Sequence, residues 1–271
     1  MPLVRVGDIE LDCERRGSGP PLLLIMGMSG TTLHWGEPFL GELEEHFEVI
    51  LYDHRGVGRS SRVHGSLSII QMASDAAGLL AELGLDSAHV LGISMGGMVA
   101  QELALAHPER IRTLVLGCTY CGGEGSALTA QEVLQRLTEG MLSGNRERAL
   151  RASWEANVSA AMAGDHAAYA RFLAIAERRA VAVPVIMAQM QACSDHDASA
   201  RLSRLTMPTL VLHGSADEML DVENARLIAS RVPGARLEIL DDVGHLFFWE
   251  RPRLAAEMIR THAACLPSLT P

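Results

Sequence analysis

Apolar residues along the chain follow two alternating spacings, which predict strands and helices in turn. After Ser68 they recur every three or four residues, as on one face of a helix that ends at Gly84. Short, nearly continuous apolar runs fit buried strands. Strands are predicted at 3–16 (two, turned at 7–8), 22–26, 49–52, 90–93, 113–116, 209–213 and 236–240, and further helices at 37–46, 95–107, 222–232 and 252–262. Such alternation is typical of an α/β protein whose parallel sheet has helices on both faces.

The alternation stops between residues 122 and 205, where the sequence is rich in Ala, Leu, Arg and Met and has no strand-like segment. The capping-box pattern Thr129-Ala-Gln-Glu132 predicts a helix start there. Further helices are expected at 145–162, 165–180 and 184–193. The block is too long for a simple connection and contains no repeat. We therefore expect a helical cap at 122–205, inserted into a core made of 1–121 and 206–271, with a loose tail at 266–271.

The segment Gly92-Ile-Ser94-Met-Gly96 lies between a predicted strand and a predicted helix. This G-x-S-x-G pattern is typical of a sharp strand-to-helix turn, which needs glycines because side chains at 92 and 96 would collide. The turn strains the serine and exposes its hydroxyl at the start of the helix. Ser94 is therefore a candidate nucleophile, the alternative being a tight turn with an ordinary serine.

A nucleophilic serine needs a base within hydrogen-bond reach, and the base needs an acid that orients it. In an open parallel sheet, these groups come from loops at the carboxyl ends of strands, where Ser94 lies. The loops after the last two predicted strands supply Asp217 and His245. We predict that Asp217 is the orienting acid and His245 the base, with Glu218 and Asp221 as alternative acids.

An oxyanion formed by attack of Ser94 needs two hydrogen-bond donors. Met95 follows the nucleophile and opens the helix, so its N–H is the first predicted donor. The second is expected from the loop after the strand at 22–26, and we predict the N–H of Met28.

The composition of the chain argues against several classes of chemistry, partner and location. All 23 basic residues are arginines, and a chain without lysine excludes Schiff-base, pyridoxal-phosphate and Walker-type phosphate chemistry. A net charge of −10 argues against nucleic acid or an anionic membrane as a partner. No apolar run approaches the roughly 18 residues of a membrane span, and no signal peptide is recognised. The five cysteines form no framework, and Cys118-Thr-Tyr-Cys121 lacks the context of a redox or zinc site, so a reducing cytoplasm and no metal are expected.

Four segments, in order along the chain, resemble those of α/β-hydrolases of the carboxylesterase, lactonase and enol-lactone hydrolase type. They are the nucleophile elbow around Ser94, the D-x-R-G-x-G-x-S loop at Asp53–Ser60, the acid loop at His213–Asp217 and the histidine loop at Gly244–Glu250. The family's oxyanion loop usually begins His-Gly, whereas this chain has Met26-Gly27-Met28. Because the donor is a backbone group, this difference alters the pocket wall rather than the oxyanion hole. The resemblance implies a mostly parallel eight-stranded sheet with the helical cap after strand 6.

A serine at the elbow implies an acyl-enzyme, which suits esters and lactones and requires no cofactor. We expect a small-molecule ester or lactone substrate, bound between core and cap by a monomer or homodimer. The predicted pocket residues are Gly27, His34, Trp35, Tyr120, Met141, Trp154, Met219 and Leu246. The same triad would also serve C–C bond hydrolysis or cofactor-free perhydrolysis, and a low-turnover receptor for a small molecule is a further alternative.

Overall fold

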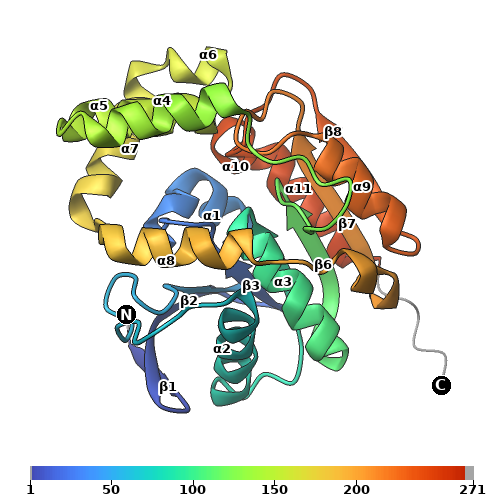
Figure 1. The fold of residues 1–271 in the computed structure, drawn as a ribbon. Coiled ribbons are helices and arrows are strands. Elements are labelled where there is room, and N and C mark those ends of the chain that lie inside the picture. The colour runs from blue at the N-terminus through green and yellow to red at the C-terminus, as the bar shows by residue number, and fades with distance from the viewer. Residues whose placement is uncertain (1, 266–271) are drawn as a thin grey trace, which may run out of the picture.

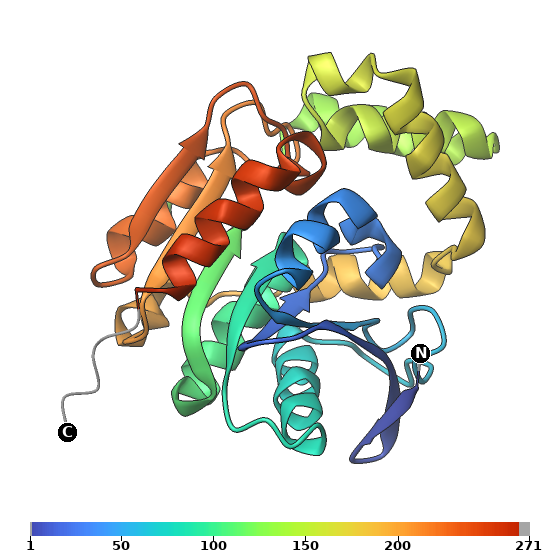
Figure 2. The same ribbon diagram turned by 180° about the vertical axis from the view of Figure 1, so that it is seen from behind.

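The computed structural model describes residues 2–265, so the tail predicted at 266–271 lies outside the described part. One sheet of eight strands forms the centre of the molecule, seen from the front in Figure 1 and from behind in Figure 2. The strands are β1 Leu3–Val6, β2 Ile9–Gly17, β3 Pro21–Ile25, β4 Glu48–Tyr52, β5 Ala88–Ile93, β6 Ile111–Gly117, β7 Thr209–Gly214 and β8 Arg236–Leu240. The helices outside the predicted cap are α1 Glu37–Glu44, α2 Ile69–Glu82, α3 Met95–Ala106, α9 Glu223–Arg231, α10 Phe247–Glu250 and α11 Pro252–Ala263.

The strand order is β1-β2-β4-β3-β5-β6-β7-β8. β2 pairs antiparallel with both β1 and β4, whereas every pairing from β4 to β8 is parallel. The predicted fold class, with a mostly parallel eight-stranded sheet, is therefore confirmed. Because parallel strands end at one edge of the sheet, the loops after β3, β5, β7 and β8 all lie along that edge.

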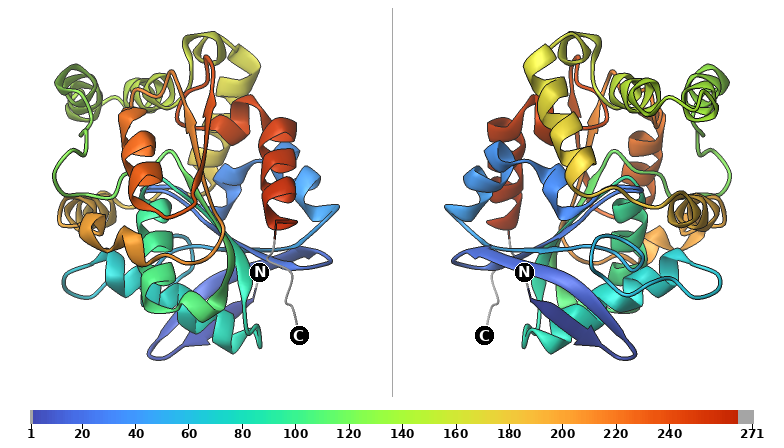
Figure 3. Two further views of the ribbon diagram at one scale, coloured as in Figure 1. Left: turned by 90° about the vertical axis from the view of Figure 1, so that its right-hand side faces the viewer. Right: turned by 90° about the vertical axis from the view of Figure 1, so that its left-hand side faces the viewer.

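Each face of the sheet has its own hydrophobic core, because successive side chains of a strand point to opposite faces. In β5, Val90 belongs to the core beneath α2, α3 and α9, and Leu91 to the core beneath α1, α10 and α11. Figure 3 shows these helices on the two sides of the sheet. The start of α2 is as predicted, since the Ser68 hydroxyl accepts a hydrogen bond of 3.1 Å from the N–H of Gln71.

The insertion after strand 6 is helical, as predicted. Its helices are α4 Gln131–Leu142, α5 Arg146–Asn157, α6 Ala160–Ala163, α7 His166–Arg178 and α8 Val183–Ser194, followed by a short 3-10 helix at Ser199–Arg204. In Figure 1, α4 to α7 lie together above the sheet, and α8 returns across the molecule toward α3. We call α4 to α8 the cap, and the boundaries 122 and 205 stay predictions. Within residues 2–265, no helix has both the length and the apolar character needed to cross a bilayer.

The single helix predicted at 145–162 is wrong, because the chain breaks between α5 and α6. Val158 is extended, with φ −132° and ψ 161°, and Ser159 caps α6. The break lets the cap backbone approach the loop after β8 closely. A Cβ on Gly244 would lie only 2.5 Å from the carbonyl carbon of Val158. A tertiary contact, which the local pattern does not reveal, accompanies the end of this helix.

The capping box predicted at Thr129 is also wrong. The residue that caps α4 is Ala130, which offers no side-chain acceptor. The Thr129 hydroxyl instead donates a hydrogen bond of 2.7 Å to the carbonyl of Met219, in the loop after β7. The Thr129 hydroxyl, which the local pattern assigned to the start of the helix, instead forms a contact between cap and core.

Candidate active site

Ser94 stands at the turn from β5 into α3 in a strained backbone conformation, with φ 54° and ψ −125°. Such a conformation costs a non-glycine residue roughly 1–3 kcal/mol. The flanking glycines are required by close contacts. A Cβ on Gly92 would lie 2.2 Å from the carbonyl oxygen of Gly96, and one on Gly96 would lie 2.0 Å from that of Ile25. The predicted strand–turn–helix context of Ser94 is thus present.

Two backbone N–H groups near Ser94 are available to an oxyanion. Met95 is the first residue of α3, where an N–H has no intrahelical acceptor. Met28 follows Gly27, on which a Cβ would lie 3.1 Å from Cβ of Ser94. In the described chain neither N–H makes a hydrogen bond. Both predicted donors therefore belong to segments next to the candidate nucleophile.

Asp217 and His245 form a buried pair. Nδ1 of His245 lies 2.7 Å from Oδ2 of Asp217, and the two side chains are 4% and 0% exposed. Oδ1 of Asp217 accepts hydrogen bonds from the backbone N–H groups of Met219 (2.8 Å) and Leu220 (3.0 Å). These contacts hold the carboxylate so that it faces the imidazole.

A second histidine, which the sequence analysis missed, also contacts this carboxylate. Nε2 of His213 lies 3.1 Å from Oδ2 of Asp217 and 2.9 Å from the carbonyl of Leu220. Because both neighbours are acceptors, we assign the proton of the neutral ring to Nε2. Burial alone raises the pKa of Asp217, but the charge of His245 and the hydrogen bonds from both histidines outweigh it and lower that pKa. His213 is the first residue of the His213–Asp217 motif, but only the contact of its side chain with Asp217 reveals that it helps to hold the carboxylate.

The two alternative acids are engaged elsewhere. Glu218 forms an ion pair with Arg136 of α4, and its side chain is half exposed. Oδ1 of Asp221 accepts a hydrogen bond of 2.8 Å from the N–H of Glu223, at the start of α9. The geometry therefore favours Asp217 as the acid that orients His245.

The candidate nucleophile and the Asp217–His245 pair lie at the same edge of the sheet. The Ser94 N–H donates to the carbonyl of Gly117 at the end of β6, and the Cys118 thiol lies within 4.8 Å of ligand atoms of Asp217 and His245. Within residues 2–265, neither the Ser94 hydroxyl nor Nε2 of His245 makes a hydrogen bond. In substrate-free enzymes the bond between nucleophile and base is often long, so this geometry is compatible with a triad.

Cys118, Asp217 and His245 offer three ligand atoms of the kinds that bind metals, and all three are close together. Burial raises the pKa of the Cys118 thiol, and the neighbouring Asp217 carboxylate raises it further. A protonated thiol is a poor ligand, and Nδ1 of His245 is already hydrogen bonded. The donor set therefore fits an acid–imidazole pair better than a metal centre. Cys118 and Cys121, like the other three cysteines, are free thiols.

The loop that carries His245 is braced by the cap through Glu250, a second residue that sequence analysis did not single out. Oε1 of this buried carboxylate accepts hydrogen bonds of 2.8 Å from the N–H groups of Gly244 and Ser159. The N–H of Leu246 donates to the carbonyl of Asn157 at 2.8 Å. Glu250 is the last of the seven residues in the histidine-loop motif, but the motif alone assigned it no role.

The Asp53–Ser60 loop braces the opposite flank. Oδ1 of Asp53 accepts a hydrogen bond of 2.7 Å from the N–H of Thr32, and Oδ2 lies 2.6 Å from Nη1 of Arg179, which follows α7. Burial raises the pKa of Asp53, although the bond from Thr32 and the charge of Arg179 oppose this effect. His54 contacts the Met26 carbonyl at 3.0 Å through Nε2. An ion pair with the cap thus holds the segments around the oxyanion loop.

His54 is expected to make stability depend on pH. Burial lowers its pKa to about 4, although the hydrogen bond to the carbonyl of Met26 opposes the shift. An unfolded histidine titrates near 6.5, so between these values the unfolded chain binds more protons and stability falls as the pH falls. We expect His54→Gln to reduce the loss of unfolding free energy between pH 7 and pH 5 by about 2 kcal/mol, measured by urea unfolding. His64→Gln, at an exposed position, is the control, and an equal loss in the wild type and His54→Gln would contradict the assignment.

Two of the predicted pocket residues, Trp35 and Trp154, are tightly packed against aromatic rings. Trp35 is 1% exposed and lies 4.8 Å from Phe248, ring centre to ring centre, in the core beneath α1. Trp154 is 0% exposed and packs at 5.2 Å against Phe172 and at 5.6 Å against Trp249. Trp35 lies in the core beneath α1, and Trp154 lies between cap helices α5 and α7 and Trp249.

The other predicted pocket residues occupy two regions. Gly27, His34, Tyr120, Met219 and Leu246 lie in segments that follow β3, β6, β7 and β8, on the same edge as Ser94. Met141 is exposed near the end of α4. Their contact with substrate stays a prediction.

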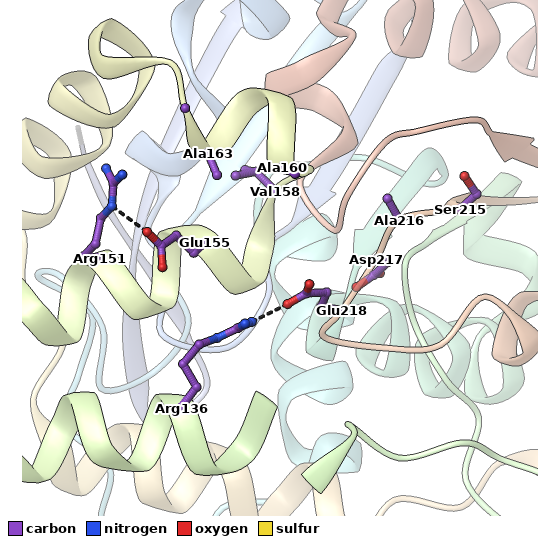
Figure 4. A pocket seen from close by; sticks show the side chains of 11 residues that line it. Arg136, Arg151, Glu155, Val158, Ala160, Ala163, Ser215, Ala216, Asp217 and Glu218 are labelled. Carbon is purple, nitrogen blue, oxygen red and sulfur yellow. Dashed lines mark hydrogen bonds and ion pairs between the residues drawn. The ribbon is translucent and has the colours of Figure 1, made fainter. Parts of the chain in front are cut away.

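A hollow of about 670 Å³ lies between the cap and the acid loop. Figure 4 shows the ion pair of Arg136 with Glu218, which joins α4 to this loop, and the pair of Arg151 with Glu155 on α5. The walls of the hollow include Asp217 but neither Ser94 nor His245. The hollow therefore borders the acid from the cap side and is not itself the place where Ser94 would attack.

Residues 20–252 match the family model described as the alpha/beta hydrolase fold. The chain is 32% identical over 267 residues to a protein of Azorhizobium caulinodans named "Putative carbamate hydrolase RutD", with 96% of this chain and 97% of that protein covered. Its structure is similar to that of a hydrolase from Pseudomonas aeruginosa PA01 (28% identity, TM-score 0.83, 96% and 97% of the two chains). It is also similar to Est816, described as an N-acyl homoserine lactone degrading enzyme (28% identity, TM-score 0.77, 96% and 99% of the two chains).

Proposed function

The chain belongs to the alpha/beta hydrolase fold family, and we propose that it is a serine hydrolase that cleaves carboxylic esters or lactones through an acyl-enzyme. One observation carries the proposal. Ser94 lies on a strained turn next to the segments of Met28 and Met95, whose N–H groups make no hydrogen bond in the described chain. The same edge of the sheet also holds the Asp217–His245 pair. A nucleophile, oxyanion donors and an oriented imidazole are the parts that acyl transfer requires.

In the proposed cycle, Oγ of Ser94 attacks the substrate carbonyl carbon while Nε2 of His245 takes the hydroxyl proton. Asp217 keeps the other ring proton on Nδ1 and stabilises the imidazolium that forms. The N–H groups of Met28 and Met95 stabilise the oxyanion. When the carbonyl reforms, the bond to the leaving oxygen breaks and His245 returns its proton to that oxygen. Water, deprotonated by His245, then attacks the acyl-enzyme and releases the acid and Ser94.

Two of the relatives favour particular substrates with an acyl-type carbonyl. The structural neighbour Est816 is described as an N-acyl homoserine lactone degrading enzyme, which favours lactones among the substrates to be tried. The relative named for carbamate hydrolysis supports a second candidate function at the same site. A carbamate presents the same carbonyl to Ser94, with a nitrogen in place of the first acyl carbon. The proposed groups would act on it in the same order.

A fluorophosphonate probe tests the proposal directly, because it phosphonylates only an activated serine. We expect stoichiometric labelling at Ser94, located by mass spectrometry of the peptides, and steady turnover of 4-nitrophenyl butyrate. Comparison of kcat/KM over acyl esters, N-acyl homoserine lactones and carbamates then identifies the substrate class. Labelling without turnover would favour a small-molecule receptor, and an unlabelled Ser94 in the folded protein would refute the assignment.

A further inference from the structure

Gln189, in the cap helix α8, reaches the oxyanion loop. Its side chain is fully buried, and its Oε1 accepts a hydrogen bond of 2.9 Å from the N–H of Ser29. Ser29 has a positive φ of 59° in the tight turn that follows Gly27, an uncommon conformation for a residue other than glycine. A polar side chain from the cap therefore holds the residue next to Met28, the proposed oxyanion donor.

The other end of the same amide has no partner. Because the Ser29 N–H is a donor, the oxygen of Gln189 must face it, so the orientation of the amide is settled by its surroundings. Nε2 then points away from Ser29, and in the part of the chain that the structure describes it is buried without any hydrogen-bond acceptor. Leaving a buried donor unpaired is unfavourable, because the group has lost its hydrogen bonds to water and gained none in the protein. Ala188 and Ala192 on the same helix pack against the hydrophobic core, so the surroundings are largely apolar.

The strand order indicates which part of a substrate this donor would meet. β3, whose loop contacts Gln189, lies on one side of β5 and Ser94, whereas β6, β7 and β8 lie on the other. His245 follows β8 and must face the leaving oxygen to return its proton. The acyl group of a substrate attached to Ser94 therefore extends toward the β3 side, where the oxyanion loop and α8 meet.

We infer that Gln189 binds the acyl part of the substrate, and that this acyl part carries an oxygen acceptor, such as an oxo or ether oxygen, a few bonds from the carbonyl that Ser94 attacks. The inference rests on the proposed function. Nε2 of Gln189 donates to that oxygen, while Oε1 keeps its bond to Ser29. The site then favours such acyl groups over plain alkanoyl groups, because a plain chain leaves the amide unpaired.

Two matched substrate pairs test the inference. In 4-nitrophenyl methoxyacetate and butyrate, an ether oxygen replaces one methylene, and in 4-nitrophenyl 4-oxopentanoate and pentanoate, a carbonyl replaces one. For each pair, the ratio of kcat/KM between the oxygen-bearing and the plain ester is compared in the wild type and in Gln189→Met. We expect the ratio to fall about 3- to 10-fold in at least one pair, the value of one hydrogen bond. If Gln189→Met only loosens the oxyanion loop, it lowers kcat/KM for both esters of a pair by the same factor, and the ratio does not change.

Gln191→Met is the control, since it makes the same change two residues along α8 at an exposed position. It should leave both ratios at their wild-type values. If Gln189→Met does not fold, Gln189→Glu at pH 8 keeps an acceptor for Ser29 and removes the N–H groups, and the same fall in the ratio is expected. Ratios unchanged within twofold in both pairs would overturn the inference. A wild type that hydrolyses no ester, or whose Ser94 is not labelled, would instead show that the proposed function has failed.

Discussion

Replacing Ser94 with alanine is expected to lower kcat for ester hydrolysis by about 10⁴- to 10⁶-fold. The alanine removes the hydroxyl that attacks the substrate but keeps Cβ, so the strained turn and the N–H of Met95 stay in place. The remaining rate comes from binding and the oxyanion donors alone. Steady-state kinetics with 4-nitrophenyl butyrate measures the effect, and the fluorophosphonate should no longer label the protein.

Ser74→Ala is the matched control. The Ser74 hydroxyl is exposed on α2 and only donates a hydrogen bond of 3.0 Å to the carbonyl of Ile70. It should keep wild-type activity. Circular dichroism and thermal unfolding should show that Ser94→Ala is folded. Activity of this variant within tenfold of the wild type would remove Ser94 from the mechanism, and with it the acyl-enzyme.

Asp217→Asn is expected to lower kcat by about 10⁴-fold. The asparagine oxygen should stay toward the backbone N–H groups of Met219 and Leu220, which now hold Oδ1 of the acid. Its NH₂ group then faces the two rings. There the NH₂ group faces another donor, the N–H at Nε2 of His213. It also donates to Nδ1 of His245, which must therefore be unprotonated. The proton of His245 moves to Nε2, so the ring can no longer take a proton from Ser94.

The two neighbouring acids supply the controls for this prediction. Glu218→Gln removes only a half-exposed ion pair with Arg136, and Asp221→Asn changes only the start of α9. Each should retain activity within about threefold of the wild type, since exposed pairs contribute little. The kinetics are measured as for Ser94, with unfolding monitored in parallel. A small loss in Asp217→Asn together with a large loss in either control would transfer the role of orienting acid to that residue.

Local sequence was sufficient where the physics is local. The apolar runs predicted the strands, because a strand buried on both faces needs apolar side chains at nearly every position. The glycines around Ser94 predicted its turn, because the close contacts at Gly92 and Gly96 arise within a few residues and the neighbouring strand. Chain order and strand ends then placed Asp217 and His245 at one edge, where their side chains are hydrogen bonded.

Expectations failed where a distant segment competes for a group. The Thr129 hydroxyl bonds to Met219 across the cap–core boundary instead of capping α4. The surroundings of Trp35 and Trp154 are also set by aromatic rings that lie far away in sequence. Whether a large apolar side chain fills a core or lines a cavity depends on its neighbours in space, and its own sequence context does not contain them.

By itself, then, the sequence determined the α/β fold, the helical insertion after strand 6 and the candidate residues Ser94, Asp217 and His245. Each of these follows from spacing, from glycine geometry or from the order of segments in a resembling family. Only the tertiary structure revealed the second histidine on Asp217, the bracing of the histidine loop by Glu250 and the half-paired amide of Gln189. The reason is that a buried polar group is stabilised or left unpaired by partners from other parts of the chain, and only folding brings those partners to it.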